Sequence, residues 1–343
     1  MSQDVAVDVQ GGAALADEDA AEVAAALADA LAAPEPVSPV ELMDGWDRLK
    51  RELAALLRHT APDAAWAEAL EGIVGRLQVL ARRDFDAALY LLLQDAGNGD
   101  DDRYSTHHAI LCALVGEVCA DWLEWPAEEI DTLVRAALTM NLSMSTMQDS
   151  LARQVEPLSA AQRERIDGHA EESAALIAAS GVKNTLWIEV VRLHHGGPGV
   201  DEAGASAPPA QRLARLLRRI DVYTAKLSSR ASREAVSPAI AARDTCLDAD
   251  GQPDTLGTAI LRKIGLYPPG CFVKLANGDL GVVVRRGTKA HMPVVAALRR
   301  EDGSLHFSPK RRDTSGKRHA IVHGVTASQV KVRMNHLRTL ALT

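Results

Sequence analysis

Several histidines and one aspartate stand at helical spacing from apolar residues in the middle of the chain. His107, for example, comes four residues before Leu111 and seven before Leu114. Comparable inward positions are held by four further residues: His108, His169, His194 and Asp221. Residues three or four apart lie on one helix face, so these side chains are expected to point toward a core. In helical bundles, imidazoles and carboxylates that converge from facing helices bind ions such as Mn, Fe, Zn or Ni. The spacing therefore predicts a metal or phosphate site.

Each of these positions also has a purely structural interpretation. A single inward histidine is commonly a core residue whose hydrogen bonds are satisfied. An inward aspartate such as Asp221 is less ordinary, because burying an unpaired carboxylate is costly. The coincidence of such residues on several helices is what favours a site over a set of unrelated core residues.

The stretch LVRAALTMNLSM, residues 133–144, raises a related question. Its apolar residues recur three and four apart, which predicts a helix that faces a core. Asn141 falls on the inward stripe, three residues after Leu138 and beside Met140. Burying an amide without partners costs about 1–3 kcal/mol, so Asn141 is expected to face a polar pocket.

Composition sets broad bounds on the fold and its partners. The 343 residues suggest two or three domains, and 47% hydrophobic with only 3% aromatic residues favours helices filled by alanine and leucine. A net charge of −8 argues against a DNA partner. Neither a secretory signal nor an apolar run of roughly 18 residues is found, so no membrane partner and a cytoplasmic location are expected. The cysteines are interpreted as reduced, buried small hydrophobes: Cys112, Cys119, Cys246 and Cys271.

The pattern along the chain predicts four parts. Residues 1–38 are acidic and alanine-rich, which is typical of a disordered tail, and 39–98 form an N-terminal helical region. A long helical domain follows over 103–265. The period then changes from 3.6 to 2, so 267–343 is predicted as a small β-rich module with hairpins at Asn277-Gly278 and Asp302-Gly303. Its last segment, 326–343, fits either a strand or a helix. The predicted class is mainly α, with a small C-terminal antiparallel β module shaped as an SH3-like or partly open barrel.

The order of polar motifs over residues 104–265 resembles that of the HD-GYP proteins, a branch of the HD superfamily. That family carries a first His, then HD-x-G-K, a lone His, HH, and D-x-x-x-A followed by S-x-R and R. The corresponding positions here are His107, residues 140–144, His169, His194-His195 and the run DVYTAKLSSRASR from Asp221. The resemblance implies an HD-type helical bundle that holds metal ions and hydrolyses cyclic di-GMP to pGpG or GMP.

Carried over position by position, the resemblance implies five metal ligands: His107, His169, His194, His195 and Asp221. It also implies that Arg230 and Arg233 lie near substrate phosphate, a role that suits the guanidinium fork. The alternative for both arginines is simple solvation at a helix end.

The departures from the family pattern fall on its central motif. Met140 and Asn141 stand where the family has the HD pair, and Met144 stands where it has lysine. In the family the aspartate of this pair bridges two metal ions, and a neutral amide cannot replace its charge. A thioether is also a poor ligand for hard or borderline ions. The expected cofactor is one divalent ion, Mn, Fe or Zn, at reduced occupancy, and hydrolysis is expected to be impaired or absent.

Three functions remain open on these grounds. The first is a degenerate HD-GYP-like signalling protein that binds cyclic di-GMP, a related cyclic dinucleotide or a protein partner without turnover. The second is an active metal-dependent cyclic di-GMP phosphodiesterase with rearranged ligands such as Asp149 or Glu172. The third is a structural adaptor whose pocket is filled.

Overall fold

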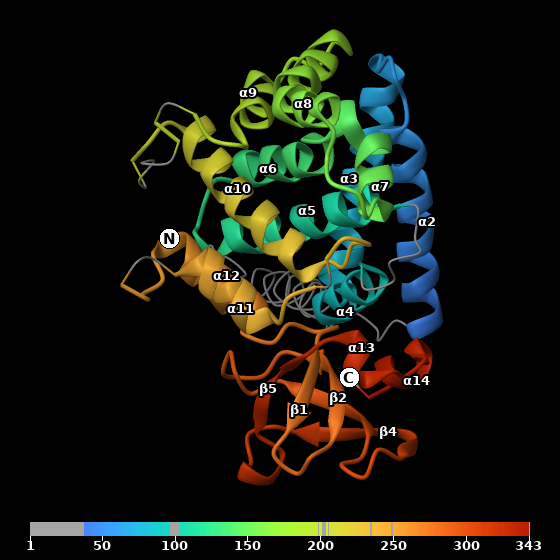
Figure 1. Ribbon diagram of the computed structural model, residues 1–343. Coiled ribbons are helices and arrows are strands. Elements are labelled where there is room, and N and C mark those ends of the chain that lie inside the picture. The colour runs from blue at the N-terminus through green and yellow to red at the C-terminus, as the bar shows by residue number, and fades with distance from the viewer. Residues whose placement is uncertain are drawn as a thin grey trace, which may run out of the picture. The chain divides into compact units, whose positions relative to one another are not determined.

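A computed structural model of the chain describes residues 38–96, 103–197, 199–200, 204, 206–233, 235–247 and 250–342. The predicted acidic tail over 1–38 therefore lies outside the described residues, apart from Ser38. From Pro39 onward the residues form one compact unit. Within the described ranges, helices predominate and a single small antiparallel sheet lies toward the C-terminus (Figure 1). The predicted class, mainly α with a C-terminal β module, is confirmed at this level.

Three helices make up the N-terminal region: α2 (Pro39–Leu57), α3 (Ala64–Arg83) and α4 (Phe85–Ala96). Asp63 caps α3 by accepting a hydrogen bond from the Trp66 amide at 2.9 Å, which satisfies one of the free donors at a helix start. Residues early in α2 contact residues late in α3, and residues late in α2 contact residues early in α3. The pairs are Gly45–Leu80, Glu52–Arg76 and Leu56–Trp66. The two helices are therefore antiparallel.

The central helix of the bundle is α5 (Tyr104–Trp122), whose residues are buried on nearly every face. It packs against the three N-terminal helices α2, α3 and α4. It also packs against four later helices: α6 (Ala127–Thr139), α7 (Ser145–Arg153), α10 (Pro209–Leu227) and α12 (Thr255–Ile264). Three more helices complete this part: α8 (Ala160–Ala179), α9 (Thr185–Leu193) and α11 (Pro238–Cys246). Because α5 is enclosed, polar residues on several of its faces are buried.

The stretch over residues 133–144 is helical for only part of its length. The α6 helix ends at Thr139, and a 3-10 turn, η1 (Leu142–Met144), follows before α7. Ser143 is held by α8, because its amide donates to Ser173 Oγ at 3.1 Å and its hydroxyl donates to the His169 carbonyl at 3.0 Å. The expectation of a helix through residue 144 is therefore wrong, and Asn141 is half-buried rather than fully buried.

The C-terminal sheet has the strand order β4-β3-β2-β1-β5. Its strands are β1 (Phe272–Leu275), β2 (Leu280–Arg285), β3 (Val294–Arg299), β4 (Leu305–Asp313) and β5 (Ile321–Val325). The antiparallel pairings of β1 with β2 and of β3 with β4 confirm both predicted hairpins. The segment after the sheet forms two short helices, α13 (Ala327–Val330) and α14 (His336–Leu340). Of the strand and the helix that the sequence left open for residues 326–343, the helix is therefore the one formed.

The sheet is tied to the helices by ion pairs. Arg286 Nε lies 2.5 Å from Asp86 Oδ1, and Arg285 lies 3.1 Å from the carboxylate of Asp84. Asp84 and Asp86 stand at the start of α4, where negative side chains also favour the helix N-terminus. Among the described helices, none has both the length and the apolar character needed to cross a membrane.

Candidate metal centre

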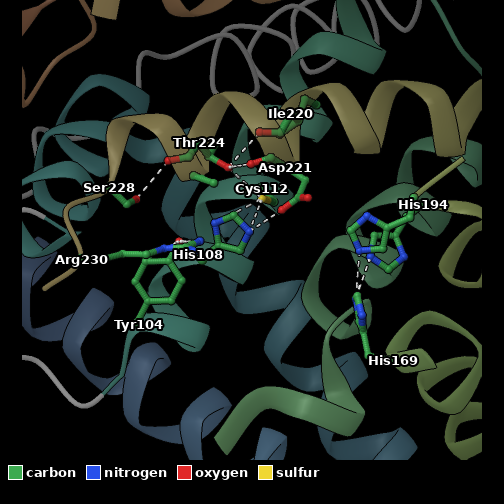
Figure 2. Close-up of polar contacts among 12 residues, drawn as sticks. Tyr104, His108, Cys112, His169, His194, Ile220, Asp221, Thr224, Ser228 and Arg230 are labelled. Atoms are coloured by element: carbon green, nitrogen blue, oxygen red, sulfur yellow. Dashed lines mark hydrogen bonds and ion pairs between the residues drawn. The ribbon is translucent and has the colours of Figure 1, made fainter. Parts of the chain in front are cut away.

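Three imidazoles meet where α8 and α9 pack together. His169 lies within α8, His194 caps the C-terminus of α9, and His195 follows it. The Nε2 atom of His169 lies 3.3 Å from that of His194 and 3.1 Å from that of His195. Figure 2 shows His169 and His194 pointing toward one another. These three residues form the imidazole cluster, and their ligand atoms all lie within 4.8 Å of one another.

Backbone hydrogen bonds orient two rings of the imidazole cluster. Nδ1–H of His169 donates to the Ile166 carbonyl at 2.5 Å, and Nδ1–H of His194 donates to the Val191 carbonyl at 2.6 Å. A neutral ring with a protonated Nδ1 has only a lone pair at Nε2. The Nε2 atoms of His169 and His194 therefore face each other as two acceptors, which repel unless a cation or a proton lies between them. This arrangement fits a metal ion.

The electrostatics of the imidazole cluster also fit a metal ion. Burial, helped by the neighbouring His195, lowers the pKa of His194 to about 3. Burial likewise lowers the pKa of His169 and of His195. The three rings are therefore neutral at neutral pH, which is the protonation state that coordinates metal ions. His195 is exposed, so the cluster is open to solvent on one side.

A second polar group lies between α5 and α10, formed by His108, Cys112 and Asp221. His108 Nε2 lies 2.7 Å from Asp221 Oδ1, and Cys112 Sγ lies 3.7 Å from the same nitrogen. Figure 2 shows Asp221 turned from α10 toward His108. Burial would raise the pKa of Asp221, but the hydrogen bond and charge of His108 outweigh it and lower that pKa to about 2.

The ring of His108 is enclosed on both sides. Burial would lower its pKa, but the negative potential from Cys112 and Tyr104 and the hydrogen bond with Asp221 raise it well above its ordinary value. The Tyr104 ring stacks on His108 with centroids 5.7 Å apart. Arg230 in turn lies 4.7 Å from the Tyr104 ring centroid and donates to its hydroxyl at 2.6 Å. A continuous line of contacts thus runs from Arg230 to Asp221.

The five predicted ligands do not all come together. His169, His194 and His195 form the imidazole cluster, whereas Asp221 groups with His108 and Cys112. His194 and His195 add to the effect of His108 in lowering the pKa of Asp221. His107 is buried outside both groups, with its Nε2 atom 4.0 Å from Asp95 Oδ2. The neighbouring His108 is the residue that faces Asp221.

The other predicted site residues have varied surroundings. Arg233 donates to the Ala225 carbonyl at 2.6 Å and forms an isolated backbone bridge with Arg230. Met140 and Met144 are buried. The carboxylate of Asp149 accepts a hydrogen bond from the Ser105 amide at 2.7 Å, so it serves the start of α5. Glu172 is exposed, and its negative charge offsets a part of the lowering that burial causes in the pKa of His169.

Two residues at this centre were not selected from the sequence as ligands. The sequence predicts His108 only as an inward residue and Cys112 only as a small hydrophobe. The signal that could have found them is their separation of four residues, which places both on one face of a single helix. All four cysteines are free thiols; Cys112, Cys119 and Cys246 are buried and Cys271 is half-buried.

The fold and the imidazole cluster together define a helical-bundle protein with a candidate metal centre. The chain is 28% identical over 195 residues to the cyclic di-GMP phosphodiesterase PA4108 of Pseudomonas aeruginosa. That match covers 54% of this chain and 45% of the relative, so the chain spans less than half of the relative's length. This partial match suggests the HD-GYP branch of the HD superfamily. No protein-family model matches the chain, and no solved structure does.

Proposed function

We propose that this chain is an HD-GYP-like signalling protein that binds cyclic di-GMP, or a related cyclic dinucleotide, with impaired or absent hydrolysis. The observation that carries the proposal is the convergence of the His169 and His194 lone pairs, whose Nε2 atoms face each other 3.3 Å apart. Such an arrangement suits an ion that contacts phosphate, and the similarity to a cyclic di-GMP phosphodiesterase supports the nucleotide class.

One divalent ion, Mn, Fe or Zn, would be held by His169, His194 and His195. Asp221 groups with His108 and Cys112, and its negative charge would favour a cation at the neighbouring imidazole cluster. When bound, such an ion acts as a Lewis acid toward a phosphoryl oxygen. The backbone acceptors of Ile166 and Val191 orient two of the three rings before any ion arrives. Orientation of this kind by outer hydrogen bonds is common around metal-binding histidines.

Impaired hydrolysis follows from the residues at the positions of the family's HD pair. Met140 is an uncharged, buried thioether, and Asn141 is a neutral amide. Neither supplies the negative charge that would hold a second ion beside the first. With one ion, the attacking and leaving oxygens of a phosphodiester would lack the paired clamp of two-metal sites.

Arg230 and Arg233 are proposed as the phosphate-binding residues. Arg230 is fixed by its hydrogen bonds to Tyr104 and its stacking on that ring, so little side-chain entropy would be lost when it meets a phosphate. Arg233 lies beside it in the bridge and is exposed. A planar guanidinium matches phosphate in a bidentate manner.

The test is calorimetric titration of cyclic di-GMP into the purified chain, with chromatography of the nucleotide after incubation with Mn. Binding without pGpG release is expected, and Arg230→Ala should abolish the binding. Arg262→Ala removes an exposed arginine on α12 and serves as the matched control, which should bind as the parent does. Sustained pGpG release would instead support the active phosphodiesterase.

An active phosphodiesterase is the second candidate, because His108 and Asp221 form a further ligand pair close to the imidazole cluster. Asp149 contributes little to that candidate, since its carboxylate caps α5. The structural adaptor, which would bind a protein partner only, is the outcome if the chain binds neither metal nor nucleotide.

A further inference from the structure

We propose that the outer strand of the C-terminal sheet, β4, is a docking surface for single-stranded nucleic acid. Phe307 would act as a stacking platform between two groups of basic side chains. This inference goes beyond the proposed function because it requires neither a metal ion nor a cyclic dinucleotide.

The net charge of the chain is distributed unevenly. Residues 267–343 hold 14 lysine and arginine side chains but only 4 aspartate and glutamate side chains, a net charge of +10. The whole chain has a net charge of −8, so the residues before 267 carry −18. An asymmetry of this size between two parts of a chain is typical of proteins in which one part meets a polyanion.

Part of this positive charge is neutralised within the structure. Arg285 and Arg286 pair with the carboxylates at the start of α4, and Arg312 lies 3.4 Å from the carboxylate of Asp279. The exposed basic residues of β4 and the turn after it differ, because within the described ranges no carboxylate forms an ion pair with them. They are Lys310, Arg311, Lys317 and Arg318. These four charges are therefore available to a partner.

The same strand presents an aromatic ring to solvent. In the order β4-β3-β2-β1-β5, β4 pairs with β3 alone and is an edge strand. Phe307 is 95% exposed on this strand, more than any other large hydrophobic side chain among the described residues. Basic residues on an edge strand commonly serve to prevent pairing with another sheet. That role does not explain an exposed phenyl ring, whose burial against a partner would be favourable.

The basic side chains lie on both sides of the Phe307 ring along the strand. The strand register places Arg299 opposite Leu305 before the ring and Ala297 opposite Lys310 after it. Strand residues are about 3.3 Å apart, so Lys310 follows the ring at ~10 Å. Proteins that bind single strands stack bases on aromatic rings and hold the backbone phosphates with flanking lysine and arginine. The order basic, aromatic, basic along β4 fits that chemistry.

An anionic membrane is the competing partner for a basic surface with an exposed ring. On β4, Leu305 is 54% exposed beside Phe307, whereas Val322, at 57%, lies on β5 at the other end of the strand order. Surfaces that lie on membranes bury a continuous apolar face between the lipids. Two neighbouring apolar side chains among many charges favour the single strand instead.

The experiment follows the fluorescence anisotropy of labelled oligo(U) RNA titrated with the full chain, in EDTA and without cyclic di-GMP. Binding is expected, and it should weaken as the salt concentration rises. Replacing Lys310→Gln and Arg311→Gln together should reduce the slope of log Kd against log salt by about 1.4, because each lost phosphate contact on a single strand accounts for about 0.7. Phe307→Ala should weaken binding roughly 5- to 150-fold while leaving that slope unchanged.

Two control variants match these changes elsewhere on the surface. Val322→Ala shortens an exposed apolar side chain on β5, and Arg51→Gln with Arg163→Gln removes two exposed charges from α2 and α8. Both controls should bind oligo(U) as the parent does. Failure of the parent to bind, or an equal loss in the controls, would overturn the proposal. Equal affinity for an RNA duplex would do the same, because paired bases are not free to stack on Phe307.

A measurement on the parent alone tests the placement without any variant. Ultraviolet cross-linking to oligo(U), followed by mass spectrometry of the digested chain, should place the cross-link in residues 305–318. Cross-links confined to the helices would contradict the proposal, and so would capture by phosphatidylglycerol vesicles without RNA binding. Because metal and cyclic di-GMP are absent throughout, a failure here would leave the proposed function standing, and a failure of cyclic di-GMP binding would leave this surface standing.

Discussion

The hydrogen bond between Trp187 and Thr139 anchors the helix that carries two of the cluster histidines. Trp187 Nε1 donates to Thr139 Oγ1 at 2.9 Å, and both residues are almost completely buried. Thr139→Val keeps the shape of the side chain but removes the acceptor. A buried indole N–H without a partner costs about 1–3 kcal/mol, so the free energy of unfolding should fall by that amount. Binding of divalent metal should also weaken, because α9 ends at His194.

The assay is urea unfolding followed by far-ultraviolet circular dichroism, with and without a chelator. Thr146→Val is the control, because Thr146 is an exposed residue in the first turn of α7. The control should change the stability by no more than about 0.5 kcal/mol. If Thr139→Val were as stable as its control, the packing of α9 on the end of α6 would not be as described.

Three further predictions concern other parts of the molecule. Restoring the family's pair with Met140→His and Asn141→Asp should raise the divalent metal bound per chain, measured by elemental mass spectrometry; unchanged metal content would contradict the alignment at these positions. Asp86→Ala leaves Arg286 without its carboxylate partner and should lower the free energy of unfolding by about 1–3 kcal/mol in urea. Ser159→Ala removes the capping box of α8 and should cost about 0.5–2 kcal/mol by the same measurement, and a neutral effect would show that this cap adds no stability.

Much of the architecture could be predicted from periodicity and turn chemistry. The helices of the N-terminal region and the hairpins at Asn277-Gly278 and Asp302-Gly303 follow from local signals that tertiary contacts reinforce. The end of α6 could not be predicted in this way. Residues 140–144 keep an apolar spacing compatible with a helix, but hydrogen bonds from Ser143 to α8 replace the helical pattern there.

The candidate site was only partly accessible to the same reasoning. His107 and His108 both stand at helical spacing from apolar residues, and α5 is buried on nearly every face, so periodicity could not choose between them. Which one faces Asp221 depends on how α5 and α10 pack together, and this is a property of the assembled bundle. The polar surroundings of Cys112 could not be predicted for a related reason, because a buried thiol has the sequence pattern of a small hydrophobe whatever its neighbours are.

Binding of a cyclic dinucleotide without hydrolysis is the function that we propose for this chain. Equilibrium dialysis of cyclic di-GMP against the Mn-loaded chain, followed by chromatography of the nucleotide on both sides, tests binding and turnover in one measurement. The nucleotide is expected to accumulate on the protein side and to be recovered intact. An equal distribution across the membrane would contradict binding, and recovery as pGpG would contradict the loss of hydrolysis.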